Sequence, residues 1–240
     1  MHVETLATRP DLLDAALRIG DIGFEFLQHD EIGTLTRAAR LARRWPEHFL
    51  VLLDGGEPVA RAVGVPVAFP APGREELPDT GWDGAILWAA EDALDGRRPT
   101  ALAALDVQVA LGRRGEGIAA EALRVLEESA RGLSRLVVPV RPTTKALEPH
   151  VPMAEFVARR RADGLPEDPW LRVHERLGAR FVKIAPFAMT VSGTLWQWHE
   201  WTGKPLSDGP NVVEGALVPV LASVAHDFAV YVEPNVWVEY

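Results

Sequence analysis

Residues 105–119 read LDVQVALGRRGEGIA, and the interpretation of the whole chain starts from this stretch. Its first part alternates like a β-strand, and a strongly helical pattern runs from Gly115 to Arg131. The glycines between them permit positive φ angles and let the backbone come close to a ligand. Unpaired N–H groups in the first turn of a helix, aided by the helix dipole, bind anions such as a pyrophosphate. We therefore expect an anion site where the strand passes into the helix.

Two common phosphate-binding motifs are excluded at this turn. The three-glycine spacing of a dinucleotide fingerprint is missing, and so is the Lys-Ser/Thr ending of a Walker A loop. A Gly-x-Ser-x-Gly elbow is also absent from the chain, so a hydrolase triad has no anchor.

The composition is that of an ordinary globular protein. The chain has 240 residues, of which 48% are hydrophobic and 25% charged, enough for one large domain or two small ones. Cysteine is absent, which excludes disulfides, a thiolate nucleophile and cysteine-ligated metals. The seven histidines show no paired ligand spacing, so no metal site is expected.

Charge and hydropathy limit the partners and the location. The net charge of −9 disfavours non-specific nucleic-acid binding. Apolar runs fall far short of the roughly 20 residues that span a bilayer, so no membrane association is expected. The first residues lack the basic start and apolar stretch of a secretory signal. Together with the missing cysteine, these features predict a cytoplasmic protein.

Strand and helix patterns mix along the chain, which predicts an α/β or α+β fold with a partly antiparallel sheet. Proline, glycine and Asp-Gly or Gly-Gly pairs separate the elements. The predicted strands are 48–54, 58–69, 101–111, 133–140, 180–191, 212–220 and 228–238, the last two forming an antiparallel pair. The predicted helices are 11–19, 31–44, 82–94, 115–131, 154–162, 168–177 and 193–201.

The glycine turn resembles the pyrophosphate loop of the GNAT superfamily of N-acetyltransferases, whose signature is Arg/Gln-x-x-Gly-x-Gly/Ala. Arg114, Gly117 and Ala119 satisfy it. A second match, His174-Glu-Arg-Leu-Gly178, stands where members commonly carry Tyr-Glu-x-x-Gly. The resemblance covers about residues 50–191 and implies a GNAT-like mixed central sheet flanked by helices, with a C-terminal β extension. We expect a core at 1–202 and an extension at 203–240 packed on it.

The resemblance also implies a function. Members transfer an acyl group from coenzyme A to an amine, so we expect an acetyl-CoA-dependent N-acetyltransferase acting on a small-molecule amine, as a monomer or homodimer. The residues expected to bind the cofactor are Val107, Val109, Leu111, Arg114, Gly115, Glu116, Gly117, Ile118 and Ala119.

The transfer needs a backbone donor for the thioester carbonyl and a base for the ammonium. Val109 is the expected donor. Strand alternation places Asp106 and Gln108 on one face, with Leu105, Val107 and Val109 on the other. Asp106 is therefore the candidate base, unless it is simply a solvated or capping carboxylate.

The reaction also needs an acid for the departing thiolate. His174 replaces the tyrosine that often serves the family as this acid, and histidine can donate a proton near neutral pH. The alternative is a packed histidine bonded to a carbonyl.

Two other functions remain open at this stage. Aminoacyl transfer from a charged tRNA would need a continuous basic surface joining Arg37, Arg40 and Arg44 to the Arg159–Arg161 cluster. A non-catalytic acyl-CoA-binding protein is the other, because the family's tyrosine is missing. The fold alone does not choose among these functions.

Overall fold

The computed structural model describes residues 1–20, 23–35 and 37–240. Its strands are β1 (His2–Thr5), β2 (Phe49–Asp54), β3 (Glu57–Val67), β4 (Ala101–Val109), β5 (Arg135–Val140), β6 (Arg180–Gly193), β7 (Gly209–Asn211), β8 (Val220–Ser223) and β9 (Phe228–Glu239). Its α-helices are α1 (Leu13–Leu17), α2 (Glu31–Leu35), α3 (Ala38–Arg44), α4 (Gly81–Asp95), α5 (Ile118–Ser129), α6 (Met153–Ala158), α7 (Pro169–Arg176) and α8 (Leu195–Thr202). Short 3₁₀ helices are η1 (Pro10–Leu12), η2 (Glu25–His29), η3 (Pro46–His48), η4 (Leu111–Arg113) and η5 (Lys145–Leu147).

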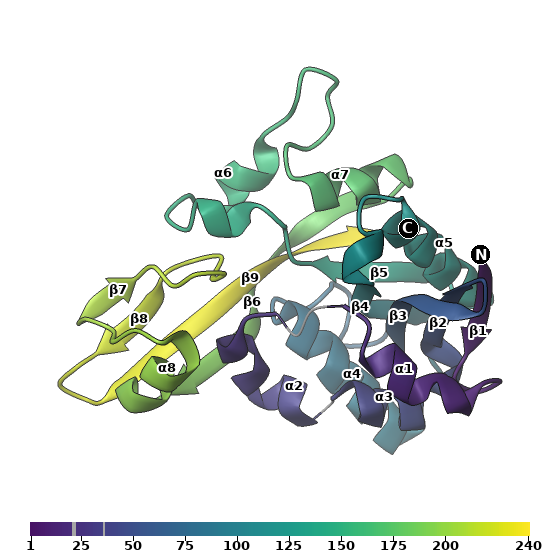
Figure 1. Cartoon of the computed structure of the whole chain (residues 1–240), viewed down its shortest axis with the longest axis horizontal. Helices are drawn as coiled ribbons and strands as arrows, with labels where there is room; N and C mark the ends of the chain where they lie inside the picture. The colour runs from purple at the N-terminus through teal and green to yellow at the C-terminus, as the bar shows by residue number, and fades with distance from the viewer. Residues whose placement is uncertain (21–22, 36) are drawn as a thin grey trace.

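The strands form one mixed sheet in the order β1-β2-β3-β4-β5-β9-β8-β7, and β6 pairs with the other edge of β9. The β4–β5 pair is parallel and the other pairs are antiparallel. Figure 1 shows β9, in yellow, running from the centre of the molecule out to the end that carries α8, β7 and β8. The mixed sheet with flanking helices confirms the predicted fold class.

Helices cover both faces of the sheet. On one face, Ala85 of α4 belongs to a core with residues of α1 and α3 and with Ala101 and Ala103 of β4. On the other, Ala122 of α5 packs with residues of α6, α7 and β5 and with Leu102 of β4. Figure 1 shows α1, α3 and α4 on the side opposite α5 and α7. The alternation of β4 thus feeds two cores, as the period of two in a strand requires.

The far end of β9 has its own core. Phe26 of η2 and Trp198 of α8 pack against Tyr231 of β9, together with residues of β6 and β8. The ring of Phe26 meets that of Tyr231 edge to face, with centroids 5.4 Å apart. This cluster accounts for Trp198 and Trp201 of α8, whereas Trp196 is exposed, and it fixes η2 against the sheet.

Two sequence predictions differ from the structure. The helix expected at 31–44 is two helices, α2 and α3, and Thr36 between them lies outside the described residues. The strand expected at 212–220 is wrong, because β7 ends at Asn211 and β8 begins at Val220. Gly215 between them has a φ of +84°, and Pro219 has no N–H to give to a ladder.

The boundary between a core at 1–202 and an extension at 203–240 stays a proposal. Strand pairing places part of that extension inside the central sheet, because β9 lies between β5 and β6. Removing β9 would leave one edge of β5 unpaired and would take away the strand with which β6 pairs.

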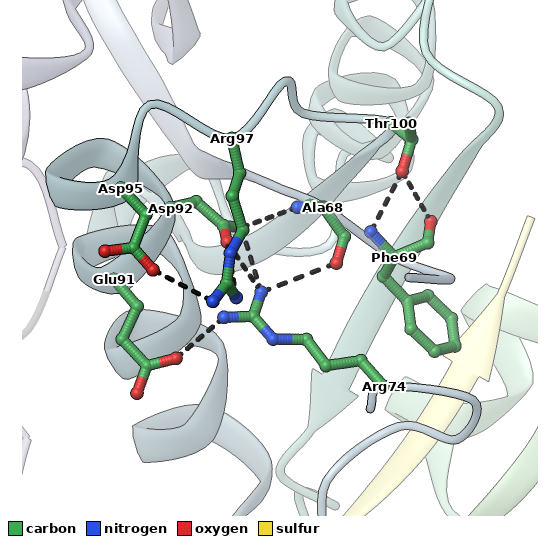
Figure 2. Close-up of polar contacts among 8 residues, drawn as sticks. All are labelled: Ala68, Phe69, Arg74, Glu91, Asp92, Asp95, Arg97 and Thr100. Carbon is green, nitrogen blue, oxygen red and sulfur yellow. Dashed lines mark hydrogen bonds and ion pairs between the residues drawn. The ribbon is translucent and has the colours of Figure 1, made fainter. Parts of the chain in front are cut away.

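A buried ion pair joins the loop after β3 to α4 (Figure 2). Arg74 and Asp92 are 5% and 4% exposed, and Nη1 of the arginine lies 2.8 Å from Oδ1 of the aspartate. Asp92 also accepts the backbone N–H of Ala68 at 2.6 Å, and Glu91 reaches the other end of the guanidinium at 2.7 Å. These contacts hold the 70–80 loop against α4, whose first turn forms part of the candidate site.

Candidate active site

The candidate site lies where β4 and β5 separate. Their parallel register covers Ala101–Ala103 and Arg135–Val137, and β4 then carries a bulge opposite Val63 and Gly64. A cavity of about 220 Å³ opens beyond this point. It is lined by Trp82, Ala104, Leu105, Asp106, Val107, Gln108, Leu123, Val138, Pro139, Val140, Arg141, Trp170, Met189, Glu233 and Asn235.

Two backbone N–H groups of β4 face the gap that β5 leaves when it separates. The N–H of Ala110 donates to the carbonyl of Val59 in β3, and Val109 pairs with Ala60. Donors alternate between the two edges of a strand, so the N–H groups of Val107 and Val109 face away from β3. They face the side where β5 has already left the ladder. The predicted donor at Val109 therefore has the orientation that binding a carbonyl oxygen requires.

The bulge changes which face one residue occupies. Leu105 packs with the core on the α4 side, whereas Val107 packs with the core on the α5 side. The expectation that Leu105 shares a face with Val107 and Val109 is therefore wrong. A bulge inserts one extra residue and locally breaks the alternation, here at the point where the cavity begins. The carbonyl of Leu105 accepts the indole N–H of Trp82 at 2.9 Å.

Asp106 faces the α1 and α4 side of the sheet, opposite Val107 and Val109, as the predicted alternation requires. Its Oδ2 lies 2.7 Å from Nε of Arg61, and that arginine also donates to the carbonyls of Ala16 and Leu17 in α1. The ion pair is half-buried and fixes the direction of the carboxylate. Among the described residues, no hydrogen bond to Oδ1 of Asp106 is found, so this oxygen remains available to a ligand in the cavity.

The glycine turn has the geometry expected of an anion site. Gly115 and Gly117 have φ angles of +87° and +81°, a conformation that L side chains rarely adopt. α5 begins directly after Gly117 and has no side-chain cap, so its first-turn N–H groups are open to a ligand. Ile118 is buried and anchors the helix, while Ala119 and the residue after it are small enough to leave the approach free.

Charged residues of the same turn divide into two groups. Arg113 pairs with Glu116 at 2.8 Å and with Asp54 at 2.9 Å. The carboxylates of Glu116 and Asp54 are therefore both neutralised by this arginine. Leu111 and Arg114 are exposed. Arg114 makes no ion pair with any described residue, so its guanidinium is free to meet a phosphate.

His174 lies deeper than its predicted role requires. It is 1% exposed, and Trp170, one turn earlier on α7, lines the cavity while His174 packs behind it edge to face. Its Nδ1 is 2.7 Å from the hydroxyl of Tyr240. Burial lowers the pKa of His174 to about 3, so the imidazole is neutral at neutral pH. A neutral, buried imidazole is a poor source of a proton for a thiolate.

A buried polar cluster that no sequence pattern indicated lies on the β9 side of the cavity. Both carboxylate oxygens of Glu233 accept the Nε–H of Arg141, at 2.9 and 3.0 Å. The hydroxyl of Tyr231 donates to the same carboxylate at 2.7 Å. Asn235 donates to the same carboxylate at 3.3 Å, and Arg141 also donates to the carbonyl of Gly215. The available signal was one carboxylate in the otherwise apolar strand pattern of 228–238.

Two further carboxyls, Asp30 and Asp83, are buried close to Trp82. Asp83 follows Trp82 in α4, and Asp30 accepts the N–H of Gly33, which packs on the ring of Trp82. Burial, followed by the charge of Asp30, raises the pKa of Asp83 to about 8, and burial also raises the pKa of Asp30. Neither residue was singled out from the sequence, because each stands in an ordinary polar context there.

The Arg159–Arg161 cluster does not supply the free positive charge that tRNA binding would need. Arg159 pairs with Glu148 and Glu155, Arg160 with Glu175, and Arg161 with Asp163. Paired arginines offer little net positive charge to a phosphate backbone.

Within the residues that the structure describes, neither a metal-ligand cluster nor a membrane-spanning helix is found. The structure groups no three His, Asp or Glu side chains there as metal ligands. It also contains no helix, within 1–20, 23–35 and 37–240, of the length and apolarity needed to cross a bilayer.

Comparison with solved structures identifies the class of fold. The loading GNATL domain of CurA from Lyngbya majuscula superposes with a TM-score of 0.60 at 16% identity, covering 100% of this chain and 96% of that one. The GphF GNAT-like decarboxylase in complex with isobutyryl-CoA gives 0.56 at 18%, covering 100% and 98%. At these identities the likeness supports the fold, which is that of the GNAT acyltransferases.

Sequence comparison identifies the family. No family model matches the chain. The curated arginine N-acetyltransferase avaD of Aspergillus versicolor is 38% identical over 204 residues, covering 75% of this chain and 69% of the relative. The chain therefore belongs to the GNAT superfamily of N-acetyltransferases. It is an acyltransferase enzyme, and a non-catalytic acyl-CoA-binding role is not retained.

Proposed function

We propose that the protein transfers an acetyl group from acetyl-CoA to the amine of a small, cationic molecule. The observation that carries the proposal is that β4 leaves backbone donors unpaired where β5 separates from it, and that α5, which follows β4 after the glycine turn, begins without a cap. The N–H groups of Val107 and Val109 would bind a carbonyl. Gly117, Ile118 and Ala119 would bind a pyrophosphate.

On the donor side, the protein would bind the phosphates of acetyl-CoA and polarise its thioester carbonyl. First-turn N–H groups of α5, Gly115 and Arg114 would hold the phosphates, with Leu111 and Glu116 beside them. The N–H groups of Val107 and Val109 would stabilise the negative charge that develops on the thioester oxygen. Donors held in a strand are already oriented before the reaction, so little reorganisation is needed.

On the acceptor side, Asp106 would accept the ammonium proton through its free Oδ1, directly or through water. Arg61 would hold the carboxylate toward the cavity through Oδ2. We do not assign the proton for the departing thiolate to His174, because that side chain is buried and neutral behind Trp170.

A cationic acceptor is favoured by the charge of the cavity wall. Asp106 and Glu233 line it, and the Asp30–Asp83 pair lies directly behind Trp82. Arg61 and Arg141 balance the first two. Because the two carboxyls of the pair share a proton, the pair adds one excess negative charge. The A. versicolor relative is described as acting on arginine, a cationic amine, which agrees with this charge.

The first test is thermal unfolding with and without acetyl-CoA, with dephospho-CoA and adenosine as controls. A ligand at about 100 times its Kd stabilises the native state by roughly 2.7 kcal/mol. For a chain of this size that is a rise in Tm of roughly 5–10 °C. No shift at millimolar acetyl-CoA would refute the acetyl donor.

The second test is turnover with a panel of amines. The CoA thiol that each transfer releases is detected by its reaction with a disulfide reagent. The chain contains no cysteine, so the protein contributes no thiol background. We expect arginine-like and other cationic amines to be acetylated and anionic amines to be inactive. Equal rates with anionic amines would contradict the assignment of the acceptor class.

A further inference from the structure

Two buried carboxyl groups from separate elements meet beside the acceptor side of the cavity. Asp30 directly precedes α2, Asp83 lies in the first turn of α4, and they are 2% and 6% exposed. They are hydrogen-bonded to each other and to the backbone of Thr190 in β6. Asp30 also accepts the N–H of Gly33 in α2. The pair therefore connects α2, α4 and β6 at one point.

These contacts require a proton between the two carboxyls. Among the described residues, neither carboxyl forms an ion pair with Lys, Arg or His. The charged groups that face them are themselves carboxylates, Glu31 of α2 and Glu233 of β9, and the β6 contact is neutral backbone. Two bare carboxylates in this position would repel each other without solvent or a cation to offset the repulsion. Oδ1 of Asp83 is buried and accepts no hydrogen bond from an N–H or hydroxyl of the described residues, so nothing else there offsets a charge on this carboxyl.

The pair is linked to the cavity through its neighbours. Trp82, next to Asp83, lines the cavity and donates its indole N–H to Leu105 in the bulge. Gly33 packs so closely on Trp82 that a Cβ there would lie 3.3 Å from the ring. Met189, next to Thr190, lines the cavity as well. Each element that the pair connects therefore touches or forms the same wall.

We propose that Asp30 and Asp83 are positioning residues of the acceptor side, and that the proton they share holds α2 and β6 against the first turn of α4 and so keeps Trp82 seated on the bulge. Loss of this proton in alkaline solution separates the two carboxylates and loosens the wall. That this wall of the cavity binds the acceptor amine rests on the proposed function. That the pair connects α2, α4 and β6 rests on the contacts described above.

The kinetic test compares the wild type with Asp83→Asn, Asp83→Ala and the exposed control Glu76→Gln. The asparagine keeps a donor toward Asp30 and cannot ionise, so it imitates the shared proton. At saturating acetyl-CoA, we expect the acceptor KM of the wild type and of Glu76→Gln to rise roughly tenfold between pH 7 and pH 9. In Asp83→Asn it should change less than about twofold. Asp83→Ala should have a raised KM already at pH 7, with kcat changed less than KM.

A second readout does not depend on turnover. We expect amide hydrogen exchange in 31–35 and 82–86, corrected for intrinsic rate, to be faster in the wild type than in Asp83→Asn at pH 9 and equal at pH 6. The pKa of Asp83 is raised in the folded state, so its stabilising effect is complete at low pH and is lost as pH rises through about 8. The Tm of Asp83→Asn minus that of the wild type should therefore grow from pH 5 to pH 9.

Either of two results would overturn the proposal: parallel pH dependence of wild type and Asp83→Asn in both exchange and Tm, or an Asp83→Asn protein that behaves like Asp83→Ala at pH 7. If no amine is acetylated at all, the proposed function fails while exchange and Tm still decide the role of the pair.

Discussion

Replacing Asp92 by alanine should be among the most destabilising single changes in the chain. The substitution leaves the guanidinium of Arg74 buried without its two-point partner and leaves the N–H of Ala68 without an acceptor. Breaking a buried ion pair from one side costs about 3–5 kcal/mol. Because Glu91 still reaches Nη2 of Arg74, we expect the lower half of that range from the arginine. The orphaned N–H adds about 1–3 kcal/mol.

The expected total of about 4–7 kcal/mol corresponds to a fall in Tm of roughly 8–28 °C for a chain of this length. The assay is thermal and urea unfolding, with Asp95→Ala as the matched control. Asp95 lies on the same helix and pairs with Arg97, but it is exposed, so its loss should cost less than about 1 kcal/mol. A double variant, Arg74→Met with Asp92→Leu, should recover much of the loss, since no charge is then buried alone.

A fall in Tm of less than 3 °C for Asp92→Ala, or equal effects of Asp92→Ala and Asp95→Ala, would refute this reasoning. The variant should also weaken acceptor binding at temperatures below its Tm. The ion pair holds the 70–80 loop against the helix whose first turn carries Trp82 and Asp83.

Three other predictions concern the site. Gly117→Val forces a β-branched residue to a φ of +81°, which should weaken acetyl-CoA binding at least tenfold in calorimetry while the acceptor KM changes little; unchanged affinity would remove this turn from the donor site. Asp106→Asn should lower kcat about 10²–10⁴-fold with nearly unchanged acetyl-CoA affinity, and a kcat within threefold of wild type would exclude Asp106 as the base. His174→Phe should keep kcat within about threefold at pH 7 but lower the Tm, because Tyr240 loses its partner; a hundredfold loss of kcat in a folded protein would restore His174 as the acid.

The parts of the site that depend on local sequence could be predicted. Gly115 and Gly117 mark a turn that needs positive φ angles, and the helix after them has a clear amphipathic pattern. The faces of Asp106 and Gln108 also follow from strand alternation. The face of Leu105 does not, because the bulge arises from the pairing of β4 with β3.

The parts that depend on distant contacts could not be predicted. Arg141 and Glu233 are 92 positions apart and meet only because β9 is inserted beside β5. The partner of His174 is 66 positions away, and without it a histidine in a motif resembles an acid rather than a buried packing residue. Asp30 and Asp83 become informative only when two otherwise ordinary carboxyls are brought into one dry location.

The insertion of β9 between β5 and β6 has a consequence for synthesis of the protein on the ribosome. One wall of the cavity, with Glu233 and Asn235, is translated after β1 to β8 and after every helix of the fold. Before β9 is made, one edge of β5 and the whole of β6 lack a partner strand. The nascent chain therefore exposes unpaired strand edges to wrong pairing until β9 joins the sheet.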